Sequence, residues 1–423
     1  MKSALITFLG TGIGNRTGES KDKYMVTRYK MPDGTVFDAT PFIGLALNSY
    51  VKPDDIHILG TVNSMWPTLV EYLQDENPSF EIDEALHENI YDTYGDPSFG
   101  NYLDETGEYL SRLLKQKGQV KLHLHGYLDD QNKMLLFLNE LTNIFKQYDT
   151  IYLDITHGFR HIPVITMTAL SYITALQPNL NIAGIWYASF ESKKSTTNTN
   201  EPARVIDLLP AWDMIEWFHA ARDFVRFGNA ADLVPIIKPI NNELSNVIKG
   251  IYDTLNLTFI EGLGDRMRRL DRSLNTTEVK EDARLKPLIP FIDDIRKYIN
   301  TQSEEWENQI RISIWYYEHK MFQQALTSLT EGIKTMTMTQ SGFDWKNRED
   351  RTGFSKDYFT PKKQRELLDR DLFKIFKTSQ KLRNDVNHAG MVLKNASSMT
   401  KSSLDAIHRL FANLKKWLEN NQN

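Results

Sequence analysis

The 423-residue sequence contains no cysteine. This absence excludes disulfide bonds, thiol nucleophiles and every zinc or iron–sulfur site that depends on cysteine ligands. A chain without cysteine has no use for an oxidising compartment, so we expect the protein to be cytoplasmic.

The sequence also lacks an apolar run long enough to cross a membrane. Residues 161–190 include no Asp, Glu, Lys or Arg, but Gln177-Pro178-Asn179 interrupts them and Thr and Ser dilute them. This pattern predicts a buried helix followed by a strand, and no membrane partner. The residues before Gly10 carry one lysine and a short apolar run, so we expect a strand there rather than a signal peptide.

The net charge is small, but the charges are unevenly distributed. Fifty Lys and Arg against 55 Asp and Glu give a net charge of −5. Residues 53–111 contain fourteen acidic side chains and neither Lys nor Arg, whereas residues 361–423 carry thirteen basic and six acidic side chains. The basic end is where we expect an anionic partner such as nucleic acid, although a solvated Lys-rich helix surface explains the same count.

The order of apolar runs predicts an α/β domain followed by helices. Short apolar strands alternate with helical stretches over the first two hundred residues, which is typical of a parallel sheet covered on both faces. Strand signals stop near Ala211, and apolar residues then recur with a helical period. We therefore divide the chain into an α/β domain at 1–205, a helical connector at 206–304 and an all-helical domain at 305–423.

Individual elements of the first domain can also be placed. The predicted strands are 3–9, 24–30, 35–39, 55–59, 119–124, 150–154 and 182–188, with helices from Pro67 and over 162–176. Pro32-Asp33-Gly34 predicts the turn of a hairpin between two of these strands. Polar runs predict loops at 193–200 and, in the last domain, at 337–360.

Two strand-end loops carry short polar residues and glycine at the sheet edge where open α/β folds bind ligands. In Gly10-Thr11-Gly12-Ile13-Gly14, glycine lets backbone N–H groups approach a phosphate, but the spacing matches neither the dinucleotide fingerprint nor a Walker A loop. A tight turn without a ligand is the alternative. The second loop offers Thr61, Asn63 and Ser64 just before a helix, where an anion is stabilised; an ordinary helix cap with Trp66 in the core is the alternative.

The third loop is Asp154-Ile155-Thr156-His157-Gly158-Phe159-Arg160, which follows a predicted strand directly. Its side chains at 156, 157 and 160 are expected to gather at the same sheet edge as the other two loops. A hydrogen-bonded structural His157 is the alternative. We expect Asp154 to orient the backbone or His157.

The basic C-terminal segment contains Arg383-Asn384-Asp385-Val386-Asn387-His388. Arg383 and His388 lie about 140° apart on a regular helix, but the following glycine indicates a helix end whose unwound last turn brings them together. Arginine binds phosphate through a planar fork and histidine exchanges a proton near neutral pH. The pair suits RNA cleavage by the substrate's own 2′-hydroxyl, without a metal; a capped helix end with a structural histidine is the alternative.

Taken in this order, these four segments resemble the CRISPR-associated ribonucleases of type III systems that join a CARF domain to a HEPN domain. Asp154 to Arg160 resembles the signature of the DxTHG-motif branch, and Phe8 to Gly12 and Asn63 to Trp66 resemble its two earlier loops. Arg383 to His388 matches the R-x4-6-H pattern of HEPN nucleases, with a polar Asn384 after the arginine. Residues 316–332 resemble the long helix that precedes that motif.

The resemblance implies a Rossmann-like CARF domain at 1–205 that senses a cyclic oligoadenylate, with tetra-adenylate favoured over hexa-adenylate as the activator. The candidate ligand-binding residues are thirteen residues of the three strand-end loops: Gly10, Thr11, Gly12, Thr61, Asn63, Ser64, Met65, Trp66, Thr156, His157, Gly158, Phe159 and Arg160. It also implies a HEPN domain at 305–423 with catalytic Arg383, His388 and Asn384.

The implied protein is an antiviral endoribonuclease that acts on single-stranded RNA. It would be a homodimer or a higher oligomer, since two HEPN domains build one composite site, and ligand binding would shift the population toward an active arrangement. Cleavage would need neither metal nor cofactor, would leave a 2′,3′-cyclic phosphate and would require no stable contact with the effector complex. Two alternatives stay open: a sensor that binds RNA or a protein without turnover, and a CARF domain that also cleaves its own cyclic ligand.

Overall fold

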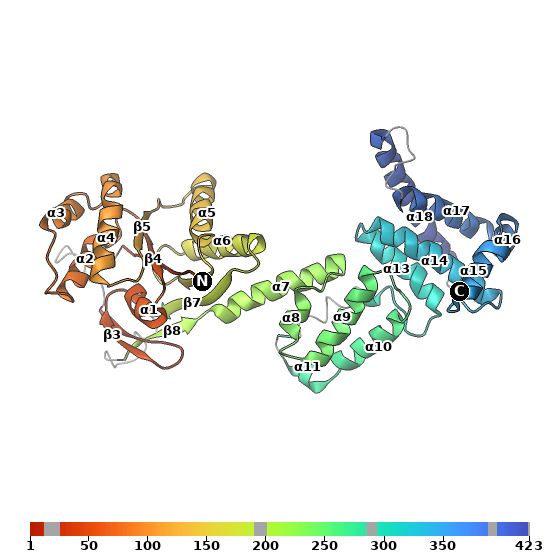
Figure 1. Cartoon of the computed structure of the whole chain (residues 1–423), viewed down its shortest axis with the longest axis horizontal. Coiled ribbons are helices and arrows are strands. Elements are labelled where there is room, and N and C mark those ends of the chain that lie inside the picture. The colour runs from red at the N-terminus through yellow and green to blue at the C-terminus, as the bar shows by residue number, and fades with distance from the viewer. Residues whose placement is uncertain are drawn as a thin grey trace. The chain divides into compact units, whose positions relative to one another are not determined.

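The computed structural model describes residues 1–11, 26–189, 201–282, 284–285, 293, 295–387 and 396–421. The chain forms two compact units, residues 1–213 and 214–423 (Figure 1). Each unit has its own hydrophobic core. No helix within the described ranges is both long and apolar enough to span a membrane.

The first unit is built on an eight-stranded sheet of order β3-β2-β8-β7-β6-β1-β4-β5. Its strands are β1 (Ser3–Phe8), β2 (Thr27–Lys30), β3 (Val36–Thr40), β4 (Asp55–Gly60), β5 (Val120–Leu124), β6 (Thr150–Asp154), β7 (Asn181–Ser189) and β8 (Ala203–Asp207). The five neighbours from β7 to β5 pair in parallel. This half of the sheet confirms the predicted parallel arrangement.

The other edge of the sheet differs from the prediction. β3 is antiparallel to β2, and β8 is antiparallel to β7. The turn between β2 and β3 is tight, with Gly34 at φ +92° and the Asp33 carboxylate accepting a bond from the Thr35 amide at 2.9 Å. A turn this short permits only antiparallel pairing, because parallel neighbours need a long crossover. The predicted parallel arrangement therefore does not extend to β3 against β2 or to β8 against β7, whereas the hairpin between β2 and β3 was predicted.

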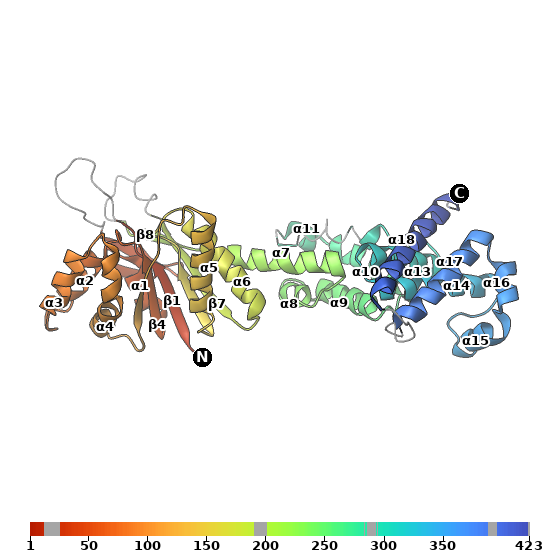
Figure 2. The same cartoon turned by 90° about the horizontal axis from the view of Figure 1, so that it is seen from above.

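Helices cover both faces of the sheet. They are α1 (Ile43–Val51), α2 (Trp66–Asp75), α3 (Glu84–Asp92), α4 (Leu103–Leu113), α5 (Gln131–Phe145) and α6 (Ile162–Leu176), with a 3-10 turn at Pro97–Tyr102. Figure 2 shows α1, α2 and α4 on one side of the strands and α5 and α6 on the other. Proline occupies the first turn of both α2 and α6, where its missing N–H costs nothing. The helix predicted over 162–176 is confirmed to the residue.

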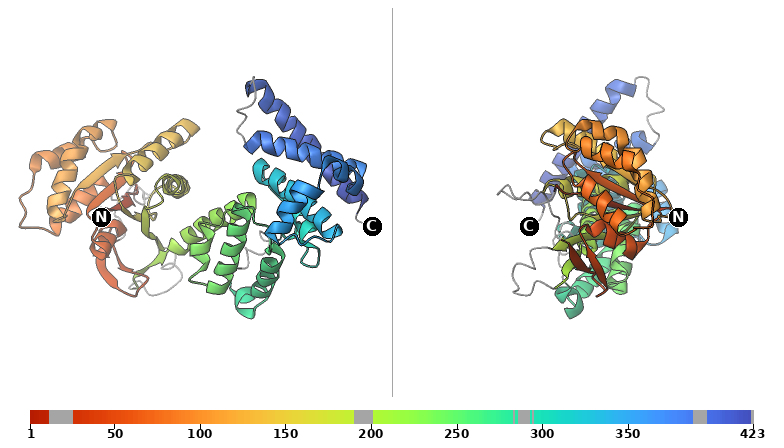
Figure 3. Two further views of the ribbon diagram at one scale, coloured as in Figure 1. Left: turned by 45° about the vertical axis from the view of Figure 1, so that its right-hand side comes forward. Right: turned by 90° about the vertical axis from the view of Figure 1, so that its left-hand side faces the viewer.

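The second unit is entirely helical over its described residues. Its helices are α7 (Leu209–Phe227, which begins in the first unit), α8 (Leu233–Ile237), α9 (Asn242–Asn256), α10 (Leu263–Leu274), α11 (Thr277–Glu281), α13 (Glu305–Glu318), α14 (Phe322–Gln340), α15 (Arg348–Gly353), a π-helical turn (Phe354–Tyr358), α16 (Pro361–Leu367), α17 (Arg370–Asn387) and α18 (Ala396–Asn420). Figure 3 follows this unit from the green α7 to the blue α18. One hydrophobic core extends from Trp217 to Leu414. The boundaries predicted at 205 and 304 stay predictions.

The segment predicted as a loop at 337–360 is more ordered than its composition suggested. Asn347 caps α15 by accepting bonds from two backbone amides, and the buried Phe354 stacks with Phe359 at 5.0 Å. These aromatic anchors lie among Gly, Asp, Asn, Lys and Arg, so the polar composition concealed them. The short helix they stabilise carries Arg351, which the loop prediction did not single out.

A chain of hydrogen bonds in the first unit links two side chains of β4 to Tyr148 and to His123 on β5. Tyr148 Oη donates to Asp55 Oδ2 at 2.7 Å, and His57 Nε2 lies 2.7 Å from Tyr148 Oη. Because the tyrosine proton goes to Asp55, His57 Nε2 must carry a proton and its Nδ1 must accept, at 2.9 Å, from His123 Nε2. His57 is only 1% exposed. Burial, followed by the nearby His123, lowers the pKa of His57 to about 3.

The buried His57 predicts acid sensitivity of the first unit. Its folded pKa lies below the ordinary value of about 6.5, so its contribution is complete above pH 6.5 and is lost as the pH falls. From pH 7 to pH 5 we expect the free energy of unfolding to drop by about 2 kcal/mol from this residue alone. Urea unfolding at several pH values should show a flatter pH slope for His57→Gln. The exposed His219→Gln should keep the wild-type slope; equal slopes for all three proteins would contradict the assignment.

Candidate functional site

The first candidate site lies at the carboxyl edge of the sheet, where β1 stands between β4 and β6. The loops after β1 and β4 are joined directly. Ser64 Oγ donates to the Leu9 carbonyl at 2.7 Å, and the Met65 amide donates to the Gly10 carbonyl at 3.0 Å. Two of the three predicted loops are therefore joined by one side-chain and one backbone hydrogen bond.

Asp154 joins the third loop to β1. Its carboxylate accepts bonds from the Thr7 hydroxyl at 2.6 Å and from the Thr156 amide at 2.9 Å, while Thr156 Oγ1 accepts from the Ala188 amide at 2.8 Å. The side chain is fully buried, at 0% exposure. Burial raises the pKa of Asp154 and lowers the pKa of His157 beside it. Asp154 thus orients backbone, as expected, and holds the end of β6 against β1.

The second loop is held together from inside. Ser64 Oγ accepts from the Thr61 amide at 2.9 Å, and Trp66 Nε1 donates to the Thr61 carbonyl at 2.8 Å. A Cβ on Gly60 would lie 2.7 Å from the Trp66 ring and 2.8 Å from Ser64 Oγ, so only glycine fits there. Thr61, Ser64, Met65 and Trp66 are all buried. Their arrangement shapes the loop, and their predicted contact with a ligand stays a prediction.

Other predicted residues reach the surface of this edge. Thr11, Gly158 and Arg160 are exposed, while Gly10, Asn63, Thr156, His157 and Phe159 are partly exposed. Gly158 has φ +106°, a conformation that a residue with a Cβ rarely adopts. Gly12 lies outside the described residues. The surface of the edge therefore offers hydroxyl, amide and guanidinium groups.

A fourth loop, after β5, was missed by the sequence reasoning. Asn63 Nδ2 donates to Tyr127 Oη at 3.1 Å, and His161 Nε2 lies 2.9 Å from the Tyr127 carbonyl. The Tyr127 ring packs against Phe159 at 5.2 Å. His125-Gly126-Tyr127 follows a strand and contains glycine, which is the same signal that identified the other loops. Tyr127 is 53% exposed and adds an aromatic face beside the predicted residues.

The second candidate site surrounds Arg383 on α17. Arg383 Nη1 bonds to Glu331 Oε1 at 3.0 Å, and Arg351 Nη2 bonds to the other oxygen at 2.6 Å. Lys334 Nζ lies 3.3 Å from Glu331 Oε1. Burial alone would raise the pKa of Glu331, but these three cations more than offset it and leave the pKa below its ordinary value. The carboxylate is therefore ionised and fixes the position of Arg383.

The other predicted catalytic residues are Asn384 and His388. Asn384 is exposed, with its Oδ1 3.5 Å from Arg383 Nη2. Asn387, the last residue of α17, accepts a bond from Gln323 Nε2 at 3.3 Å. His388 lies outside the described residues, so its predicted meeting with Arg383 stays a prediction.

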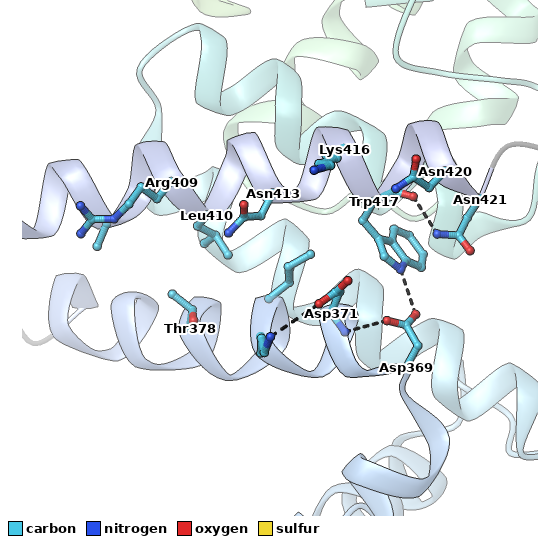
Figure 4. A pocket seen from close by; sticks show the side chains of 13 residues that line it. Asp369, Asp371, Thr378, Arg409, Leu410, Asn413, Lys416, Trp417, Asn420 and Asn421 are labelled. Atoms are coloured by element: carbon cyan, nitrogen blue, oxygen red, sulfur yellow. Dashed lines mark hydrogen bonds and ion pairs between the residues drawn. The ribbon is translucent and has the colours of Figure 1, made fainter.

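A groove of about 820 Å³ runs between α17 and α18 (Figure 4). It is lined by Asp369, Asp371, Lys374, Ile375, Thr378, Ala406, Arg409, Leu410, Asn413, Lys416, Trp417, Asn420 and Asn421. Thr378 lies five residues before Arg383, about 140° around the helix. The groove and Arg383 therefore occupy different faces of α17. Among the described residues, no group of three His, Asp or Glu side chains is placed to hold a metal ion.

Comparison with known proteins gives these sites a context. Residues 4–191 match the CARF domain of the CRISPR system endoribonuclease Csx1. Residues 213–304 match the second domain of the CRISPR-associated protein MJ1674. The chain is therefore similar, over these two segments, to domains of CRISPR-associated proteins. The CARF match contains all four loops at the carboxyl edge of the sheet.

The chain also resembles a curated relative over nearly its whole length. It is 26% identical over 435 residues to the CRISPR-associated protein MJ1674 of Methanocaldococcus jannaschii. The alignment covers 98% of this chain and 66% of the relative. It therefore includes the helical residues after 304, which carry Arg383.

Proposed function

We propose that this CARF protein is an accessory endoribonuclease of a type III CRISPR system. A cyclic oligoadenylate binds the strand-end loops of the CARF domain and activates cleavage of single-stranded RNA at Arg383 and His388. The observation that carries the proposal is the CARF match over residues 4–191 in a chain whose helical unit holds Arg383 in a net positive cluster.

The chemistry follows from the side chains. Arg383 donates to the phosphate and stabilises the charge that builds on it as the 2′-hydroxyl attacks. His388 transfers the proton, Asn384 lies beside the arginine, and the chain supplies these roles without a cofactor. The product is a 2′,3′-cyclic phosphate with a 5′-hydroxyl on the other fragment. Two protomers contribute to one composite HEPN site, so the protein acts as a homodimer or a higher oligomer.

The proposed ligand fits the chemistry of the CARF edge. Backbone amides near Gly10 and the Arg160 guanidinium suit phosphates, while the Tyr127 and Phe159 rings suit adenines. Tetra-adenylate is the favoured ring, and binding shifts the population of conformations toward the active one.

The test is activated cleavage. Labelled single-stranded RNA in EDTA should be cut on addition of cyclic tetra-adenylate, more weakly with hexa-adenylate, and not with linear tetra-adenylate as the matched control. The cyclic oligoadenylates should also raise the melting temperature of the protein at stoichiometric amounts, because they bind only its folded state. Product ends should carry the cyclic phosphate. Absence of cutting with either ring would reject the ribonuclease, and retained RNA affinity without turnover would favour a binding module instead.

A further inference from the structure

Glu331 is the centre of an unusual cluster on α14. One carboxylate binds Arg383 through Oε1 at 3.0 Å, Arg351 through Oε2 at 2.6 Å and Lys334 through Oε1 at 3.3 Å. The two guanidinium groups come from α17 and α15, so distant segments of the chain meet on one anion. Because both guanidinium groups bond to oxygens of the same carboxylate, Arg351 and Arg383 lie close to each other.

The charges of this cluster do not balance. One negative and three positive charges leave an excess of two, and within the described ranges none of the three cations forms another ion pair. Their side chains are only 21%, 33% and 18% exposed for Arg383, Arg351 and Lys334. Partly buried cations with too few anions are costly unless a further anion joins them. The excess positive charge therefore indicates a binding site for a further anion.

The guanidinium groups have donors left for that anion. Besides Glu331, Arg351 gives one bond to the Trp345 carbonyl at 3.4 Å, and Arg383 contacts Asn384 at 3.5 Å. Each guanidinium has five N–H groups, so several remain on both. Arginine forks match the oxygens of a phosphate as well as those of a carboxylate, so a phosphate can occupy the remaining donors.

We propose that Arg351 and Lys334 bind an RNA phosphate together with Arg383, and that Glu331 acts as a positioning residue for all three. This inference rests on the proposed ribonuclease function and adds two substrate-binding residues to it. Arg351 belongs to α15, outside the Arg383 to His388 motif, so the motif alone could not reveal it.

Substrate binding is tested by measuring RNA affinity in the full-length protein carrying His388→Ala, which keeps the RNA intact. Adding Arg351→Ala should weaken binding about tenfold and flatten the slope of log Kd against log salt by about 0.7, the value for one lost phosphate contact on a single strand. Arg348→Ala is the matched control, since it removes the same charge from an exposed site on the same helix. Arg351→Lys should keep the salt slope and recover part of the affinity.

Positioning by Glu331 has a separate readout. Glu331→Gln raises the net charge of the cluster, so RNA affinity should stay the same or increase while the single-turnover cleavage rate of the otherwise wild-type enzyme falls at least tenfold. If Glu331 were merely structural, Glu331→Gln would lower both the RNA affinity and the cleavage rate. If wild type binds and cuts RNA but Arg351→Ala and Arg351→Lys match Arg348→Ala in affinity and salt slope, the phosphate site is wrong and the ribonuclease stands. If wild type neither binds nor cuts RNA, both are wrong.

Discussion

Replacing Arg383 with alanine should lower the rate of activated RNA cleavage about a thousandfold. The arginine supplies charge-assisted hydrogen bonds to the phosphate, and removing one preorganised donor to a developing anion costs about two to three orders of magnitude in rate. We expect the upper end of this range because Glu331, at 3.0 Å, holds the Arg383 guanidinium in place before the substrate binds. Single-turnover cleavage at saturating cyclic tetra-adenylate measures the effect.

The controls separate catalysis from folding and activation. Arg370→Ala removes the same charge thirteen residues earlier on α17, about 20 Å along the helix axis, and should cut RNA at nearly the wild-type rate. Arg383→Lys keeps the charge without the planar fork and should recover only part of the rate. Cyclic tetra-adenylate should bind all three variants as tightly as wild type. A fast Arg383→Ala enzyme would remove the composite HEPN site from the proposal.

Local sequence signals predicted the half of the sheet that bears the first site. The strand at 150–154 and the helix at 162–176 were predicted with the bounds observed, because a short apolar run and a proline at the first turn are purely local features. The convergence of three loops followed from parallel strands ending at one edge. At the far edge the β2–β3 hairpin was predicted but β8 was not, because the pairing partner of β8 is a long-range property that its five residues do not encode.

The partners of the site residues could not be predicted for the same reason. Asp154 meets Thr7 across 147 residues, and Arg383 meets Glu331 across 52. Sequence patterns identified one member of each pair by its residue type and loop position. They did not distinguish Ser64, which is buried and bonded within the loops, from Thr11, which is exposed. Residue type indicates which chemistry a site can perform, whereas tertiary packing decides which atoms face a ligand.

The second large effect is expected in the domain that matches CARF, where Asp154→Ala should weaken cyclic tetra-adenylate binding at least a hundredfold. The substitution leaves the part-buried Thr156 amide and the buried Thr7 hydroxyl without their acceptor, which costs up to about 1–3 kcal/mol for each group. The loop after β6, which carries Thr156 to Arg160, then loses its attachment to β1. Isothermal titration measures the affinity, and RNA cleavage should lose its response to the activator in parallel.

Two further variants make this expectation specific. Asp154→Asn keeps an oxygen for the Thr156 amide and an N–H for Thr7 Oγ1, so its affinity should stay within about tenfold of wild type. Asp149→Asn changes an exposed carboxylate just before the other end of β6, where it accepts a bond from the Lys2 amide at 2.7 Å, and should bind the ring normally. Thermal unfolding checks that each variant is folded at the titration temperature. Normal binding of cyclic tetra-adenylate by a folded Asp154→Ala protein would show that ligand binding does not depend on the loop after β6. The proposed ligand site would then not lie at the carboxyl edge of the sheet.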